Sequence, residues 1–240
     1  MLKDMLYRDK GTIMIGDKKY YFKRNDADVE LLIEHIADLF HIKHAHYISV
    51  IVEDIPYYIS EDLNHIGHFI TADDLGLQSN HMRNIRDFVL TKFPEQFDHL
   101  MDQIMKMFFM DLMILNIDRN TANWGFLTKD GKTDICILDN SCSFVWYNSC
   151  MTACENKEAD SYIEITNILE YFPKQYRELF LQMFQQLDVK QLEKIIQKTE
   201  KQMGKELPYK DNYIRRFECL RNSVDSYLQQ RQIQYQKIES

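Results

Sequence analysis

The sequence predicts an α+β fold of two lobes, in which a small β-rich lobe, residues 1–63, precedes a larger and mostly helical lobe, residues 64–240. Up to about residue 64, short apolar and aromatic runs alternate with turn signals, as in strands joined by hairpins. After residue 80 the apolar residues recur with helical spacing. A chain of 240 residues, 45% of them hydrophobic, is long enough to bury a sizeable core, either as one large domain or as two lobes that share a cleft.

Charge and cysteine content narrow the class of protein. The formal net charge of -8 argues against a broad nucleic-acid-binding face, because affinity for phosphate backbones is built from clustered Lys and Arg. The five cysteines and the lack of an N-terminal charged and then apolar leader indicate a reducing compartment, and we expect a cytoplasmic protein. No stretch approaches the roughly 18 uninterrupted apolar residues of a membrane span. We therefore expect neither direct nucleic-acid binding nor a membrane span.

The β-rich lobe is predicted to contain two hairpins with a helix between them. "GTIMIGDKKYYFKRN" has a Gly16-Asp17 turn signal between two apolar runs, and "HYISVIVEDIPYYISEDL" has a turn near Glu53 to Pro56. Asn25 or Asp26 can cap the intervening helix. Its buried face follows the i, i+3, i+4, i+7 rule at Val29, Leu32, Ile33, Ile36, Ala37 and Phe40.

The second lobe is predicted to consist mainly of amphipathic helices. Asp188 is the expected N-cap of one helix, and a last helix is expected from about Asn212 to Gln232. Residues 156–240 carry no catalytic motif that we can identify. One helical face is predicted at Phe97, Leu100, Met101, Ile104, Met107 and Phe108, and another at Val189, Leu192, Ile195, Ile196 and Met203.

The densest polar segment, "NIDRNTAN", follows the helix that is expected to end near Leu115. The runs "NWGFL" and "TDICILD" after it read as two strands, and the Asp130-Gly131 pair between them is a strong hairpin signal. This layout places Asp118 and Asn123 on a loop before the first strand and Asp139 at the end of the second. Hairpin geometry can bring the three side chains together.

Two acids and an amide in one place are suited to phosphoryl transfer with Mg²⁺. Mg²⁺ prefers oxygen ligands, and transfer to a hydroxyl also needs an acid that orients the acceptor and takes its proton. In the catalytic loop of protein kinases, that acid and a metal-binding Asn are separated by four residues, and a metal-binding Asp follows on the next hairpin. Asp118, Asn123 and Asp139 have this spacing, although "DRNTAN" alone would be an ordinary polar turn.

The first lobe supplies the remaining parts in the expected order. A kinase needs a strand Lys for the ATP phosphates and a helix carboxylate that positions it. Lys23 ends the second predicted strand, and Glu30 lies near the start of the following helix. Residues 57–63 would then form the hinge, where the backbone around Glu61 and Leu63 meets adenine. Lys23 or Glu30 alone would be an ordinary surface charge, and only the two together indicate a kinase.

At these residues the chain resembles the HipA-like serine/threonine kinases, which are distantly related to the phosphatidylinositol 3/4-kinases. The resemblance rests on Lys23, on "ELLIEHIA" with Glu30, on "HIKHAHY", on "NIDRNTANWGF" and on "ILDNSCSF". The family loop reads Asn, any residue, Asp, Arg, His, two residues, Asn. Asn120 stands where the family has His, a form similar to the loop of type II phosphatidylinositol kinases. The similarity extends from about residue 10 to 150.

The resemblance implies a role for each matched residue. Asp118 would be the catalytic acid or base, and Asn123 and Asp139 would be Mg²⁺ ligands. Lys23 would contact the ATP phosphates with Glu30 as its partner. The family implies a two-lobed protein-kinase-like fold, ATP and Mg²⁺ as cofactors, a Ser or Thr hydroxyl of a protein as acceptor, and a toxin-antitoxin setting.

The resemblance also bears on partners. The N-terminal subdomain of full-length family members has no counterpart before residue 10, so the chain resembles a short form. Besides the protein substrate, the expected partners are a separate chain that supplies this subdomain, or an antitoxin.

Two other functions stay open at this point. The phosphate-covering loop should lie within about residues 3–10, and "KDMLYRDK" has no glycine, which favours a nucleotide-binding pseudokinase or interaction module. The Asn120 variant favours a lipid or small-molecule kinase, although the acidic charge and the lack of a basic patch argue against an enzyme of anionic membranes. Zinc is not expected, because no C-x-x-C or comparable spacing joins the histidines and cysteines. These residues are His41, His44, His46, Cys136, Cys142, Cys150 and Cys154.

Overall fold

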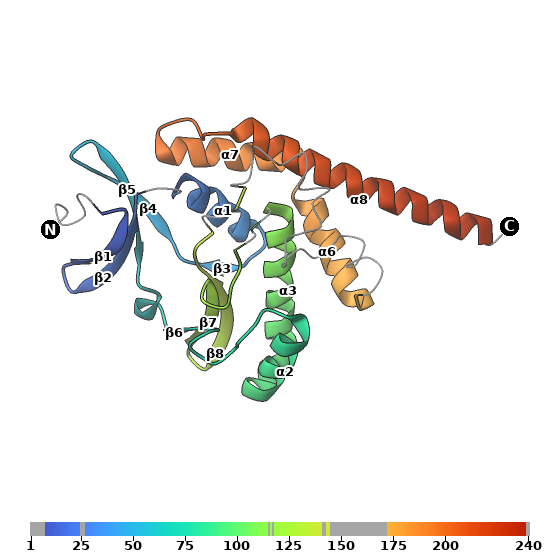
Figure 1. Ribbon diagram of the computed structural model, residues 1–240, viewed down its shortest axis with the longest axis horizontal. Coiled ribbons are helices and arrows are strands. Elements are labelled where there is room, and N and C mark those ends of the chain that lie inside the picture. Colours follow the sequence, from blue (N-terminus) through green and yellow to red (C-terminus); the bar gives the residue numbers. More distant parts are fainter. Residues whose placement is uncertain are drawn as a thin grey trace.

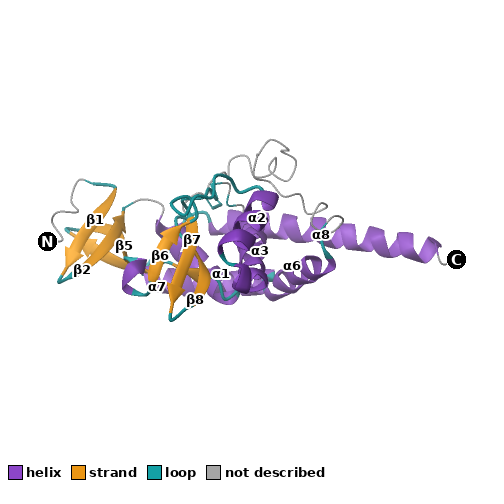
Figure 2. Ribbon diagram, turned by 90° about the horizontal axis from the view of Figure 1, so that it is seen from below, coloured by secondary structure: helices purple, strands orange, loops and turns teal. Residues whose placement is uncertain are grey.

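The computed structural model describes residues 8–24, 27–114, 116, 118–140, 143–144 and 172–238. Its architecture is α+β, with strands gathered toward the N-terminal end of an elongated molecule and helices toward the C-terminal end (Figures 1 and 2). This arrangement confirms the predicted fold class. The boundary between lobes at residue 63 stays a prediction.

The first sheet is antiparallel throughout and contains the two predicted hairpins. Its strand order is β1-β2-β5-β4, so the second hairpin adds to the first through the pairing of β2 with β5. Gly16 forms the first turn with a φ of 66°, and Glu53 and Asp54 form the second with φ of 49° and 65°. The strands are β1 (Lys10–Ile15), β2 (Lys18–Lys23), β4 (Tyr47–Val52) and β5 (Ile55–Glu61).

Helix α1 (Ala27–Leu39) connects the two hairpins and buries the predicted face. Val29 is half-buried, and the proposed capping residues, Asn25 and Asp26, lie outside the described residues. Apolar residues at helical spacing thus place the helix against the core. The buried members of the face are Leu32, Ile33, Ile36, Ala37 and Phe40.

The second sheet is built around the predicted hairpin of β7 and β8. Asp130 and Gly131 make its turn with φ of 52° and 78°, as the Asp-Gly pair predicts. The sheet order is β3-β8-β7-β6, in which β3 runs parallel to β8 and the other pairs are antiparallel. The strands are β3 (Lys43–His44), β6 (His68–Thr71), β7 (Trp124–Lys129) and β8 (Lys132–Ile137). Sequence analysis did not predict the short strands β3 and β6.

Helices α2, α6 and α8 pack against α3, which lies beside the β7–β8 hairpin with α6 next to it (Figure 1), whereas α7 packs against α1 and α8. Asp188 caps α7 as predicted, because its Oδ1 accepts a hydrogen bond of 2.7 Å from the Gln191 N–H. The last helix exceeds its predicted range at both ends and extends beyond the remaining helices (Figure 2). The helices are α2 (Met82–Lys92), α3 (Phe97–Ile114), α6 (Lys174–Gln186), α7 (Val189–Met203) and α8 (Lys210–Ile238), with short 3-10 helices at Leu63–His65 and Pro94–Gln96.

The main hydrophobic core joins α1, α3, α6, α7 and α8 to one face of the second sheet. Of the predicted α3 face, Phe97 and Phe108 are only half-buried. Within the described residues, no helix is long and apolar enough to cross a membrane. The core fixes the β7–β8 hairpin and, with it, the segments before and after the hairpin. The buried members of the α3 face are Leu100, Met101, Ile104 and Met107.

Candidate active site

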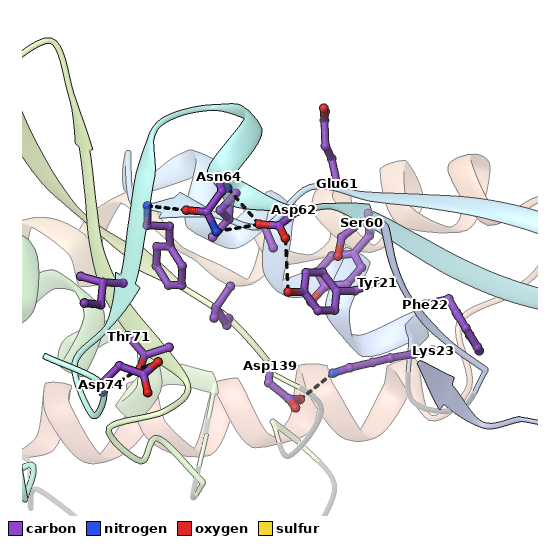
Figure 3. Close-up of a pocket in the computed structure, with 16 residues that line it drawn as sticks. Tyr21, Phe22, Lys23, Ser60, Glu61, Asp62, Asn64, Thr71, Asp74 and Asp139 are labelled. Atoms are coloured by element: carbon purple, nitrogen blue, oxygen red, sulfur yellow. Dashed lines mark hydrogen bonds and ion pairs between the residues drawn. The ribbon is translucent and has the colours of Figure 1, made fainter. Parts of the chain in front are cut away.

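A pocket of about 400 Å³ opens between the first sheet and the β6 and β8 ends of the second sheet (Figure 3). Its lining comes from β2, from the segment before β4, from the end of β5 and the residues after it, from β6, and from the residues after β8. It contains the predicted residues Lys23, Glu61, Leu63 and Asp139. The other lining residues are Tyr21, Phe22, Ala45, Tyr47, Ser60, Asp62, Asn64, Phe69, Ile70, Thr71, Asp74 and Leu138.

Lys23 joins two carboxylates that are far apart in the sequence. Its Nζ lies 2.8 Å from Glu30 Oε1 on α1 and 2.7 Å from Asp139 Oδ1 after β8, and Figure 3 shows it pointing across the pocket to Asp139. The Glu30 side chain is fully buried, whereas that of Asp139 is 42% exposed. The predicted pairing of Lys23 with Glu30 is therefore present, and Asp139 lies at the same ammonium group.

The charges of this group depend on one another. Burial alone would lower the pKa of Lys23, but the Glu30 and Asp139 carboxylates raise it above its ordinary value. Burial raises the pKa of Glu30, and the Lys23 ammonium together with the Asn140 backbone N–H opposes that effect. The Lys23 side chain thus stays an ammonium group at the border of the pocket, between two carboxylates.

Asn140 connects the residues after β8 to α1. Its backbone N–H donates to both carboxylate oxygens of Glu30, at 3.0 and 2.9 Å, and its side-chain amide donates to Oε2 at 3.3 Å. Asp139, directly before it, has a φ of 39°, a region that Asn and Asp adopt more readily than most residues. The position of Asp139 is therefore tied to the same buried carboxylate that positions Lys23.

Arg119 is the centre of a buried polar network under the loop. Its guanidinium makes a bidentate pair with Asp111 of α3, at 2.9 Å through both Nε and Nη2. Nη1 donates to the carbonyl oxygens of Asn123, at 2.8 Å, and Leu138, at 2.9 Å, and Nη2 donates to Asn140 Oδ1 at 2.6 Å. One buried side chain thus holds the start of β7 and the end of β8 against α3.

The loop turns Asp118 toward solvent while the backbone around it is fixed. The Asp118 N–H donates to Asn116 Oδ1 at 3.1 Å, and Asn123 Nδ2 donates to the Asp118 carbonyl at 2.7 Å. Weaker contacts of 3.3 and 3.4 Å join the Asp118 carboxylate to the amides of Asn120 and Asn123. Asp118 and Asn123 are thus brought together, as predicted.

Asn123 also lies next to the segment that carries Asp139. Its carbonyl accepts a 2.8 Å bond from the Leu138 N–H, which continues the β7–β8 ladder by one position. Asn123 donates through Nδ2 and therefore presents Oδ1 as an acceptor. Carboxylate and amide oxygens from Asp139 and Asn123 suit Mg²⁺, and the donor set fits such an ion.

The predicted hinge borders the pocket, but its polar side chains differ in orientation. Glu61 points away from the cavity in Figure 3 and pairs with Lys18 at 2.5 Å, while Leu63 is buried. Asp62 faces the pocket side, where it accepts from the backbone N–H of Asn64 at 3.0 Å and contacts the Tyr21 hydroxyl at 3.4 Å.

Sequence analysis missed three polar residues of this region, Asp111, Asn140 and Asp62. Asp111 had a detectable signal, because a carboxylate inside the apolar run "FFMDLM" needs a partner when buried. Burial raises the pKa of Asp111, and the Arg119 guanidinium counteracts this by favouring the carboxylate. Asn140 and Asp62 carried no such signal, since polar residues at the ends of strands are common.

The comparisons with known proteins agree with this architecture. No model of a known protein family matches the sequence, and no curated protein matches it either. Among solved structures, the chain is similar to the Helicobacter pylori proinflammatory kinase CtkA, with a TM-score of 0.62 and 14% identity over 87% of this chain and 88% of that one. The chain therefore has the fold of a kinase, which confirms the predicted kinase-like fold.

A second solved structure also matches. It is HipA of Shewanella oneidensis MR-1, solved as a toxin-antitoxin complex with HipB and operator DNA. The TM-score is 0.47 and the identity 11%, over 83% of this chain and 57% of that chain.

Proposed function

We propose that the protein is an ATP- and Mg²⁺-dependent kinase that transfers the γ-phosphoryl group to a Ser or Thr hydroxyl of a protein. The observation that carries the proposal is the meeting of Lys23, Glu30 and Asp139 at one end of the pocket, although 116 residues separate Lys23 from Asp139. The kinase fold supports it independently. Structural ion pairs also occur in proteins, but Lys23 and Asp139 line the pocket, and the three residues follow the kinase order of parts.

Each residue receives a role that its surroundings permit. Lys23 would contact the ATP phosphates, and the buried Glu30 would hold its ammonium in place. Asn123 and Asp139 would hold Mg²⁺, which neutralises charge on the phosphates when bound. The backbone near Glu61 and Leu63 would border the adenine, in a pocket whose lining combines apolar and aromatic side chains with polar ones.

Asp118 is the proposed acid or base at the acceptor hydroxyl. Asp118 is exposed, so an incoming hydroxyl can reach its carboxylate. The hydrogen bonds around its backbone fix its position before substrate arrives, and such preorganisation favours phosphoryl transfer. Asp118 would orient the hydroxyl and hold its proton on a carboxylate oxygen.

The test is transfer of labelled γ-phosphate from ATP, with Mg²⁺, into a cell lysate and into the protein itself. We expect a labelled protein band with the wild type and a loss of about 100-fold or more with Asp118→Asn, because general acid-base groups contribute on that scale. Asp130→Asn is the matched control, since Asp130 is an exposed acid at the tip of the β7–β8 turn. It should transfer phosphate at the wild-type rate.

Other outcomes identify the competing functions. Label that enters lipid or small metabolites, and not protein, would overturn the protein-kinase proposal in favour of a lipid or small-molecule kinase. A melting temperature that rises with Mg²⁺ and ATP while no label is transferred would instead indicate a pseudokinase. Equal transfer by wild type and Asp118→Asn would remove Asp118 from the mechanism.

A further inference from the structure

A second cluster of metal-ligating groups lies beside the middle of α1, one helical turn after Glu30. Glu34 of α1, His44 at the end of β3 and His46 just before β4 each offer one ligand atom, and these atoms lie within 4.8 Å of one another. The three residues come from a helix and from the segment that joins β3 to β4. Sequence analysis considered the histidines with the cysteines, and a helical Glu as their partner was not considered.

The carboxylate of the cluster is already fixed. Glu34 is buried, with 4% of its side chain exposed, and its Oε2 accepts a 3.0 Å hydrogen bond from the backbone N–H of Tyr47. The other oxygen, Oε1, lies in close contact with Nδ1 of His46. A buried carboxylate with one oxygen bound to the backbone can direct the other oxygen toward a cation.

The two imidazoles are arranged differently. His44 is largely buried and its Nε2 lies 3.0 Å from Asp38 Oδ1, a carboxylate contact that typically orients the ring of a metal-binding histidine. The other ring nitrogen, Nδ1, lies 3.1 Å from the Ala45 carbonyl oxygen, so a metal ion bound at Nδ1 would replace that hydrogen bond. His46 is 75% exposed, and the two ring centroids are 5.4 Å apart. One ring is therefore held in place, and the other has room to rotate.

We propose that Glu34, His44 and His46 form a binding site for a divalent transition-metal ion, with Zn²⁺ as its best match. Two imidazoles and a carboxylate are typical Zn²⁺ ligands, whereas Mg²⁺ prefers oxygen alone. Tetrahedral bonds of about 2.1 Å separate ligand atoms by about 3.4 Å, a spacing within the 4.8 Å that contains the three ligand atoms here. Solvent would complete the coordination on the exposed side of His46.

Such an ion would link α1 to the segment that leads into β4. Glu34 follows Glu30 by one helical turn, and Tyr47, whose N–H holds Glu34, also lines the pocket. The metal would thus stabilise the part of α1 that presents Glu30 to Lys23. The site does not require phosphoryl transfer, and it can be tested whether or not the protein is a kinase.

The experiment is a titration of the 240-residue chain with Zn²⁺ by calorimetry, and with Co²⁺ by absorption spectroscopy. We expect one tight equivalent in the wild type, affinity that is weakened by about tenfold or more in Glu34→Gln and His46→Asn, and a rise in melting temperature that these variants lose. His41→Asn is the matched control, because His41 is exposed, lies outside the cluster and has a φ of 56° that Asn tolerates. It should bind as the wild type does.

Two results would overturn the proposal. Equal affinity of wild type, Glu34→Gln and His46→Asn would show that the Glu34–His46 contact is only a hydrogen-bonded ion pair. A thiolate-to-cobalt charge-transfer band would place the ion on cysteine, although burial raises the pKa of the Cys136 thiol to about 12 and disfavours that residue. His46 is exposed, so His46→Asn is expected to fold, and its circular dichroism spectrum checks this. Asp139→Asn should leave Zn²⁺ affinity unchanged, which separates this site from the proposed Mg²⁺ site.

Discussion

The polar residues of the site fall into two regions with opposite properties. Beneath the loop, Arg119, Asp111 and Glu30 are buried and make several hydrogen bonds each. At its surface, Asp118 is exposed and its carboxylate makes only contacts longer than 3.2 Å. The buried region is built to hold the backbone, whereas the surface region leaves polar atoms available to a ligand.

This difference separates residues that stabilise the fold from residues that are available to bind or react with a ligand. Removing one member of a buried and fully bonded network leaves a charge or carbonyl without a partner, which costs stability. Changing an exposed carboxylate costs little stability and affects only what binds there. The two regions should therefore respond to substitution in different measurements, and each prediction below tests that division.

The largest effect on stability is expected for Arg119→Met. The substitution removes the guanidinium that pairs with the buried Asp111 carboxylate. The same guanidinium donates to the carbonyl oxygens of Asn123 and Leu138, which then lose that hydrogen bond. We expect the free energy of unfolding in urea to fall by about 3–5 kcal/mol. Lys174→Met, which breaks an exposed ion pair with Glu178, is the control and should change it by less than about 1 kcal/mol. If Arg119→Met lowers the free energy of unfolding by less than about 1 kcal/mol, the conclusion that this network stabilises the fold is contradicted.

For Lys23→Met we expect an intermediate effect on the free energy of unfolding, and this effect should depend on pH. The variant leaves Glu30 buried without its cation, and burial then raises the pKa of Glu30 further above its unfolded value. Stability that comes with a raised pKa is present at low pH and is lost as the pH rises through the folded-state value. The variant should therefore be near wild-type stability at about pH 5 and less stable by about 1–3 kcal/mol at about pH 8.

The double variant Lys23→Met with Glu30→Gln controls this prediction. Gln keeps the shape of Glu30 but does not ionise. The difference in free energy of unfolding between the double variant and the wild type should therefore no longer grow with pH. Urea unfolding of the wild type and the two variants at several pH values measures this difference. A pH-independent loss in the single variant would show that Lys23 stabilises the fold through packing or through Asp139, and not by neutralising Glu30.

Much of the backbone could be predicted from local sequence signals. The turns at Gly16-Asp17 and Asp130-Gly131, the Asp188 cap and the buried face of α1 each depend on residues close in the chain. Such signals act within a few residues and are independent of the rest of the fold. The kinase order of parts likewise predicted the pairing of Lys23 with Glu30, whereas the contact of Lys23 with Asp139 was not predicted.

The remaining features depend on pairings between distant segments. Strand β3 has two residues and exists because β8 lies beside it, and β6 has only four. The bidentate partner of Arg119 lies eight residues earlier on a different element, and Glu34 meets His44 and His46 only after α1 packs against the strands. No local pattern identifies such partners, because tertiary packing selects them.

The smallest effect on stability is expected for Asp118→Asn, the variant in which phosphate transfer should be lost. Its side chain is exposed and keeps nearly the same shape, and the backbone bonds to Asn116 and Asn123 do not involve the carboxylate. The free energy of unfolding should therefore stay within about 0.5 kcal/mol of the wild type, as for Asp130→Asn. A loss above about 1.5 kcal/mol would mean that the carboxylate itself holds the loop, and reduced transfer could then no longer be ascribed to chemistry alone.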